Sequence, residues 1–162
     1  LYTWKLKAIP FVGNAYIALT MAIPFVFGNF VVSTTLSPVV LVLAILGFVA
    51  GLAREIVKSA EDMEGDIKAR NSKTLPVVIG RKRALAVAIG LYLSFIPITA
   101  MPFAMGLDAG PLQLVFIGAA DGLILAICYL VARKPNDSYK FARDASLAAF
   151  MLGMVGILLA AL

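Results

Sequence analysis

The stretch REIVKSAEDMEGDIKARNSKTLPVVIG, residues 54–80, decides how this chain folds, because it gathers charge between two long hydrophobic runs. It carries five carboxylates, and eight lysines and arginines lie within residues 54–83. Over the whole chain of 162 residues, by contrast, 62% are hydrophobic and only 14% are charged. A soluble domain of this size would show polar faces along its helices, so we expect a membrane protein.

Five charge-poor runs are long enough to cross the hydrocarbon core of a bilayer. The first contains 19 residues without a charge, and a helix of that length rises about 28 Å. We expect a kink at Pro24, a second span that continues as a helix out of the membrane, and a third span broken by Pro97 and Pro102. The predicted fold is all-α, a transmembrane helical bundle that forms one domain over residues 1–162, with spans at 14–32, 38–53, 84–106, 111–132 and 145–162.

All fourteen Lys and Arg residues fall on one side of this predicted topology. Two precede the first span, eight lie in residues 54–83 and four lie in residues 133–143, whereas the loops 33–37 and 107–110 contain none. Because cytoplasmic loops collect Lys and Arg, we place the N-terminus and the loop 54–83 in the cytoplasm and the C-terminus outside the cell membrane. The net charge of +5 follows from this bias and gives no support for nucleic-acid binding.

Several classes of protein are excluded by what the sequence lacks. It has no histidine, which removes histidine-based zinc sites and the Ser-His-Asp triad. Cys128 is the single cysteine, so no intrachain disulfide forms. We expect no signal peptide before the first span, and we expect a chain that begins at Leu1 to lack its front.

The charged stretch has the pattern of a site for a metal and a diphosphate. Continuing the second span as a helix would put Asp62 and Asp66 together on one stripe of its surface, where like charges four residues apart repel. Mg²⁺ would relieve that repulsion, since it is typically held by one or two carboxylates plus substrate phosphates. Arg70 and Lys73 follow, and cations beside metal-binding carboxylates are what a diphosphate needs. The whole stripe consists of Glu55, Ser59, Asp62 and Asp66.

Each of these residues also has a plainer interpretation. The acidic residues would form a solvated patch balanced by neighbouring cations, and Arg70 and Lys73 would only anchor the loop on the cytoplasmic side. Glu61 and Glu64 face away from the stripe and are expected to be solvated. Asp121 lies in the middle of the fourth span, where we expect an interhelical hydrogen bond; an ion-coupled transporter that uses it is the alternative from another functional class.

The segments REIVK, EDMEGD and KTLPVVIG, flanked by membrane helices, resemble the second aspartate-rich motif of the UbiA-type intramembrane prenyltransferases, most nearly their archaeal branch. The resemblance covers the whole chain: LYTWKLK followed by Gly13 and Asn14 is similar to the segment before the fifth helix of the family, and KPNDSYKFARDAS to a late loop. Relatives usually have aspartate where this chain has Ser59. Family members have nine helices, and the NDxxD motif of their first four has no match here, so the five spans correspond to the C-terminal part of the fold.

This resemblance implies transfer of a geranylgeranyl group from its diphosphate to the free hydroxyl of geranylgeranylglyceryl phosphate, in archaeal-type ether lipid synthesis, with Mg²⁺ stabilising the leaving group. The partners are the membrane lipids and missing N-terminal helices that carry NDxxD. At matching positions Asp62 and Asp66 would be catalytic and hold the metal, with Ser59 beside them. Residues that would contact the diphosphate or border the substrate are Lys73, Arg70, Lys7, Tyr2 and Asn14.

Two alternatives stay open within this resemblance. Lys5 is an alternative to Lys7, and Tyr2 and Lys7 would otherwise be belt residues at the membrane surface. The acceptor would otherwise be aromatic, such as a quinone or tocopherol precursor, because acceptor identity depends on the shape of a pocket that the sequence does not show.

Overall fold

The computed structural model describes residues 11–70 and 74–161, and within them the chain is built from helices without a strand. Five of the described helices are long and apolar enough to cross a membrane, which confirms the predicted all-α class and the five spans. The elements are α1 Val12–Val32, α2 Pro38–Glu61, α3 Met63–Arg70, α4 Leu75–Ile79, α5 Arg81–Ala104, α6 Pro111–Arg133 and α7 Pro135–Ala161.

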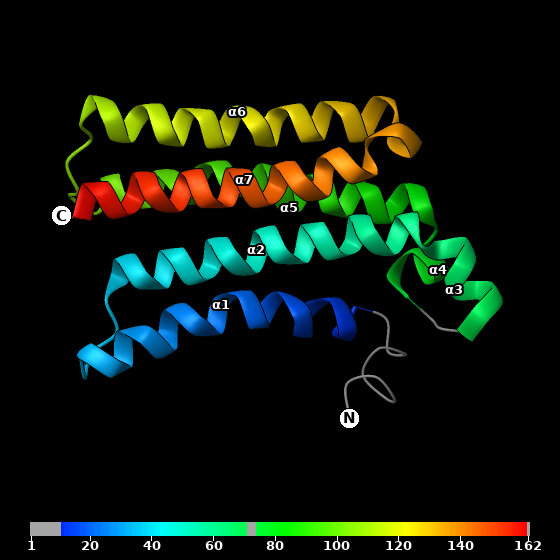
Figure 1. Ribbon diagram of the computed structural model, residues 1–162, viewed down its shortest axis with the longest axis horizontal. Helices are drawn as coiled ribbons and strands as arrows, with labels where there is room; N and C mark the ends of the chain where they lie inside the picture. Colours follow the sequence, from blue (N-terminus) through cyan, green and yellow to red (C-terminus); the bar gives the residue numbers. More distant parts are fainter. Residues whose placement is uncertain (1–10, 71–73, 162) are drawn as a thin grey trace.

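The five long helices lie side by side, and the short helices α3 and α4 lie together at one end of the bundle (Figure 1). The turn between α6 and α7 lies at the same end, which we call the charged end. The connections 33–37 and 105–110 lie at the opposite end, which we call the loop end. The basic residues that the structure describes therefore gather at one end of the bundle, as the charge pattern predicts.

Two spans differ from the sequence prediction, one in its continuity and one in its start. The break expected in the third span is wrong, because α5 runs without interruption through Pro97 and Pro102. Proline is tolerated inside membrane helices because neighbouring groups and local backbone adjustments satisfy the hydrogen-bonding groups that it frees. The fifth helix begins at Pro135, ten residues before the expected start. Proline suits the first helical turn, and Asp137 in that turn complements the helix dipole.

The helix expected to continue from the second span through Asp66 is also interrupted, so that expectation is wrong. Helix α2 ends at Glu61, Asp62 caps it, and α3 begins at Met63. Figure 1 shows α3 turning away from the direction of α2. A run of close carboxylates and the helix-weakening Gly65 disfavour an unbroken helix here.

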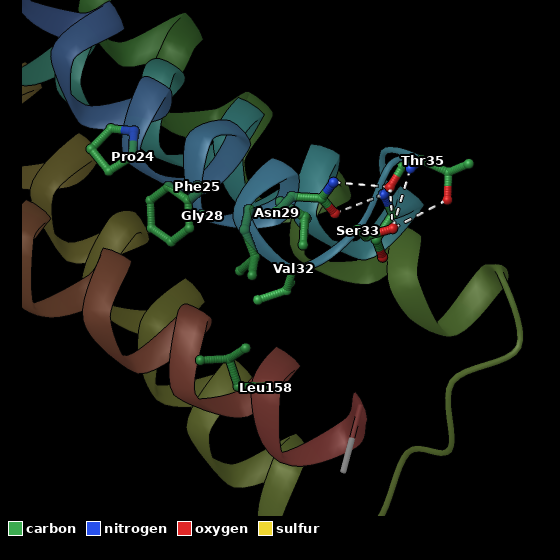
Figure 2. A pocket seen from close by; sticks show the side chains of 11 residues that line it. Pro24, Phe25, Gly28, Asn29, Val32, Ser33, Thr35 and Leu158 are labelled. Atoms are coloured by element: carbon green, nitrogen blue, oxygen red, sulfur yellow. Dashed lines mark hydrogen bonds between the residues drawn. The ribbon is translucent and has the colours of Figure 1, made fainter.

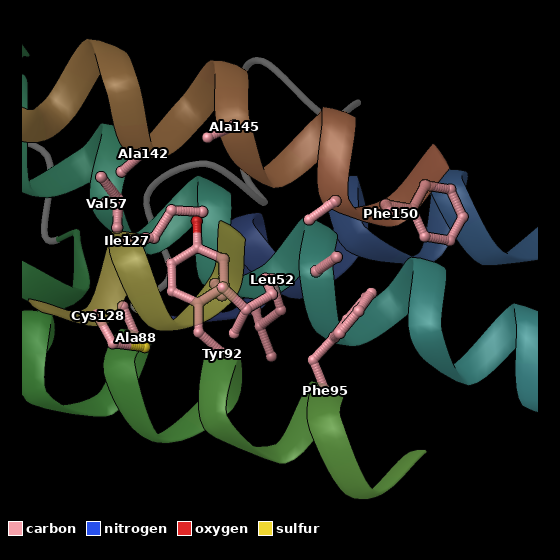
Figure 3. Close-up of a cluster of buried hydrophobic side chains, with 14 of the residues drawn as sticks. Leu52, Val57, Ala88, Tyr92, Phe95, Ile127, Cys128, Ala142, Ala145 and Phe150 are labelled. Atoms are coloured by element: carbon pink, nitrogen blue, oxygen red, sulfur yellow. The ribbon is translucent and has the colours of Figure 1, made fainter. Parts of the chain in front are cut away.

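Helix α2 is the centre of the bundle and packs against α1, α5 and α7. Figure 3 shows large side chains meeting there, among them Tyr92 and Phe95 of α5, both fully buried. Gly51 lets α1 come close, because a Cβ at this position would lie 2.8 Å from the Met21 sulfur. Other fully buried side chains are Leu46, Ile56, Ile124, Ile127 and Ile157.

Candidate functional site

Three carboxylates of the charged stretch form ion pairs with arginines. Glu55 is buried and lies 3.3 Å from the neighbouring Arg54. Oε2 of Glu61 accepts a hydrogen bond of 2.8 Å from Nη1 of Arg143 on α7. Glu64 pairs with Arg81 of α5 at 3.2 Å, and its side chain is more exposed than that of Glu61. The expectation that Glu61 is merely solvated is therefore wrong, because a residue distant in sequence covers it.

Asp62 differs from these three carboxylates. Its side chain is exposed, and it has no ion pair or hydrogen bond with any residue that the structure describes. Its backbone N–H still donates to the carbonyl of Lys58, at 3.0 Å, so it is held in place as the cap of α2. A fixed backbone and an uncommitted carboxylate suit a residue that binds a ligand from solution.

The other acidic and basic residues of the predicted site are only partly described. Asp66 and Arg70 belong to α3, but their side chains lie outside the described part. Lys73 lies outside the described residues altogether. The same holds for the predicted N-terminal site residues, Tyr2, Lys7 and its alternative Lys5. Their predicted roles stay predictions.

The structure brings Asn14 and Ser59 together. Oγ of Ser59 on α2 lies 3.4 Å from Oδ1 of Asn14 on α1. Asn14 is only 9% exposed, and its Nδ2 has no hydrogen-bond partner among the described residues. Two residues that the resemblance places in one site thus meet at the charged end, one helical turn before Asp62.

Among the described residues, no three His, Cys, Asp or Glu side chains are placed so that they could hold one metal ion together. Mg²⁺ does not require one, because it is commonly held by one or two carboxylates together with substrate phosphates and water. Asp62 supplies an exposed oxygen ligand that no arginine side chain in the described part neutralises, and the hydroxyl of Ser59 lies three residues before it. These residues therefore fit a magnesium ion that binds together with a phosphorylated substrate.

Sequence reasoning missed two buried hydroxyls at the charged end. Thr74, the cap before α4, is 7% exposed, and Tyr139 of α7 is 6% exposed. Neither hydroxyl has a hydrogen-bond partner within the described residues. Both fall in segments that carry the family resemblance, KTLPVVIG and KPNDSYKFARDAS, and this resemblance was the signal that could have pointed to them.

Asp121 makes the interhelical contact that its position predicts. Its Oδ1 lies 3.2 Å from Oγ1 of Thr99 on α5, and Thr99 is fully buried. The carbonyl oxygen of Ile96 lies 2.7 Å from the same Oγ1, so the single hydroxyl hydrogen is shared between these acceptors. The carboxyl group thus ties α6 to α5, away from the charged end.

A mainly apolar cavity of about 590 Å³ opens at the loop end, between α1, α2 and α7 (Figure 2). The Asn29 amide in its wall is already used, since Nδ2 donates to the Thr35 carbonyl at 2.9 Å and Oδ1 accepts from the Ser37 N–H at 3.0 Å. The cavity offers contact to hydrocarbon and lacks a free charged group, so it is separate from the predicted diphosphate site. Phe25, Gly28, Val32, Leu43 and Leu158 are among its lining residues.

Comparison with known proteins gives consistent results. A family model described as the UbiA prenyltransferase family matches residues 1–153. The digeranylgeranylglyceryl phosphate synthase of Archaeoglobus fulgidus is 34% identical over an alignment of 159 positions, which covers 96% of this chain and 54% of that protein. The synthase of the same name from Thermococcus gammatolerans is 34% identical over an alignment of 165 positions, which covers 100% of this chain and 57% of that protein.

A solved structure described as giving structural and mechanistic insights into the biosynthesis of digeranylgeranylglyceryl phosphate synthase in membranes has a similar fold. It matches with a TM-score of 0.81 and 27% identity, over 96% of this chain and 56% of that one. The chain therefore spans about half the length of the relatives it matches.

Proposed function

Since the chain belongs to the UbiA prenyltransferase family, we propose that it forms part of an enzyme that transfers a geranylgeranyl group from its diphosphate to geranylgeranylglyceryl phosphate. The relatives named as digeranylgeranylglyceryl phosphate synthases support this donor and acceptor. Helices beyond the five spans of this chain, carrying an NDxxD motif, would complete the enzyme. The chain alone is then expected to be inactive.

The observation that carries the proposal is the exposed carboxylate of Asp62, which has no partner among the described residues. The neighbouring glutamates of α2 and α3 are paired with arginines. Asp62 and Asp66 would hold Mg²⁺, with Ser59 beside them. When bound, the ion would stabilise the diphosphate as a leaving group.

The remaining site residues would orient the substrates. Lys73, Arg70 and Lys7 would neutralise oxygens of the diphosphate, while Tyr2 and Asn14 border the reacting groups. The bond between the allylic carbon and the diphosphate oxygen breaks, and the acceptor hydroxyl forms the new C–O bond and loses its proton. The apolar faces of the spans would sheath the prenyl chain and keep water from competing with the acceptor.

The charge asymmetry supports placing this site on the cytoplasmic side of the cell membrane. All fourteen basic residues belong to segments that the topology puts on one side. An acceptor made in the cytoplasm would then reach the site from the adjacent leaflet.

The test uses the full-length protein, purified in detergent or nanodiscs, with labelled geranylgeranyl diphosphate and Mg²⁺. Asp62→Ala and Asp66→Ala are expected to abolish transfer to geranylgeranylglyceryl phosphate. Asp144→Ala is the matched control, because Asp144 is an exposed carboxylate at the same end without a described partner. Full activity in either site variant would refute the metal site, and preferential transfer to an aromatic acceptor would replace the proposed acceptor.

A further inference from the structure

Two ion pairs hold the chain on either side of Asp62. Glu61 is the last residue of α2 and pairs with Arg143 of α7 at 2.8 Å. Glu64, in the first turn of α3, pairs with Arg81 of α5 at 3.2 Å. Helices α7 and α5 therefore each form an ion pair with the chain, α7 before the break and α5 after it.

The two pairs are unequal in strength. The side chains of Arg143 and Glu61 are 27% and 33% exposed, so their short, charge-assisted hydrogen bond is partly shielded from water and salt. The side chain of Glu64 is 74% exposed, and an ion pair so open to solvent contributes little on its own. The contact of α2 with α7 is thus the main anchor, and the contact of α3 with α5 adds to it.

Apolar contacts hold α3 only weakly among its described side chains, since Met63 is half-buried. None of them is buried, and Ile67 is 49% exposed. A helix of eight residues is marginal in isolation, because most helical stability in proteins comes from burying an apolar face. Within the described part, the direction of α3 therefore depends on the ion pairs of Glu61 and Glu64, which lie on either side of the break.

We propose that Arg143 and Arg81 are positioning residues, which fix the break at Asp62 and so set the direction in which the acidic segment of α2 and α3 presents its carboxylates. The docking of this segment follows from the ion pairs themselves. Its consequence for metal binding rests on the proposed function.

The first experiment measures docking without any need for activity. A nitroxide is attached to Gly65→Cys in full-length protein carrying Cys128→Ala, since a Cβ at Gly65 meets no described atom within 4 Å. Arg143→Gln and Glu61→Gln are each expected to sharpen the electron paramagnetic resonance spectrum as the label becomes mobile. The reversed pair, Glu61→Arg with Arg143→Glu, is expected to restore the broad spectrum. Lys140→Gln is the control, because Lys140 is an exposed cation of α7 without a described ion pair.

The second experiment connects docking to the metal. Residues that orient metal ligands typically change metal affinity by 10–100-fold, so the Mg²⁺ concentration for half-maximal transfer is expected to rise about tenfold in Arg143→Gln and to recover in the reversed pair. An immobile label in both single variants would overturn the docking. A mobile label with an unchanged Mg²⁺ requirement would overturn the positioning role. If the wild-type protein transfers no prenyl group, the proposed function fails, while the spectra still decide whether the ion pairs dock the segment.

Discussion

Oγ of Ser59 lies 3.4 Å from Oδ1 of Asn14, and this contact joins α2 to α1 one turn before the exposed side chain of Asp62. The remaining amide nitrogen of Asn14 is buried without a partner among the described residues. Buried polar groups are normally hydrogen-bonded, so this nitrogen marks a place where a further oxygen atom would fit.

The first prediction therefore concerns Ser59→Asp. The substitution supplies the carboxylate that the family resemblance implies at this position, and the Asn14 amide can rotate to donate to it. Because an added charged ligand strengthens binding of a hard cation, the Mg²⁺ concentration for half-maximal transfer should fall about threefold. Ser59→Asn is the matched control, since it adds bulk and polarity without charge. An equal effect of both variants would contradict the prediction.

The second prediction concerns the orientation of the bundle. Thr34 lies in the loop-end connection and is exposed, whereas Lys140 is exposed near the charged end. A membrane-impermeant maleimide should label Thr34→Cys in intact cells, and Lys140→Cys only after the cells are permeabilised, because basic segments stay in the cytoplasm. The native Cys128 is buried and gives the background level. Labelling of Lys140→Cys from outside would reverse the proposed topology.

The membrane spans could be predicted from the sequence because lipid leaves few choices: a long run without charge has to be a helix. Helix boundaries that depend on contacts between residues distant in sequence could not be predicted in this way. The break after Glu61 involves Arg143, 82 positions away, and nothing in the spacing of either motif connects them. Local chemistry likewise indicates a hydrogen bond at Asp121 but does not name Thr99 as its partner.

The candidate site stays a prediction. The residue types and their order single out Asp62, and its exposed carboxylate has no partner among the described residues. The pairings of Glu61 and Glu64 with arginines of other helices required the fold. The interruption of the helix at Asp62 also removes the simple i, i+4 relationship that was expected to bring Asp62 and Asp66 together.

The third prediction concerns the contact between Thr99 and Asp121. Thr99→Val removes the hydroxyl but keeps the shape, and it should lower the free energy of unfolding in detergent by about 0.5–1.5 kcal/mol, the range for interhelical hydrogen bonds in membranes. Asp121→Asn keeps a hydrogen-bonding group and should cost less. A double-mutant cycle isolates the coupling between the two sites.

The same variants distinguish an enzyme from a transporter. If Asp121 only ties α5 to α6, Asp121→Asn should keep most of the prenyl transfer activity, and the protein in vesicles should carry no proton flux. A proton flux that disappears in Asp121→Asn would support the transporter instead.

The last prediction concerns the contact between α6 and α7 at Gly156. A Cβ added there would lie 2.8 Å from Cγ1 of Ile117 and 3.2 Å from the carbonyl oxygen of Gln113, and the backbone oxygen has no rotamer by which to move away. Gly156→Ala should therefore cost about 1–3 kcal/mol of unfolding free energy, as overpacking does. Gly90→Ala on α5 is the control, since its Cβ meets no described atom within 4 Å and alanine favours the helix. Stability is measured by unfolding in detergent. Equal stability of the two variants would contradict the prediction, because it would show that α6 and α7 move apart without loss of unfolding free energy.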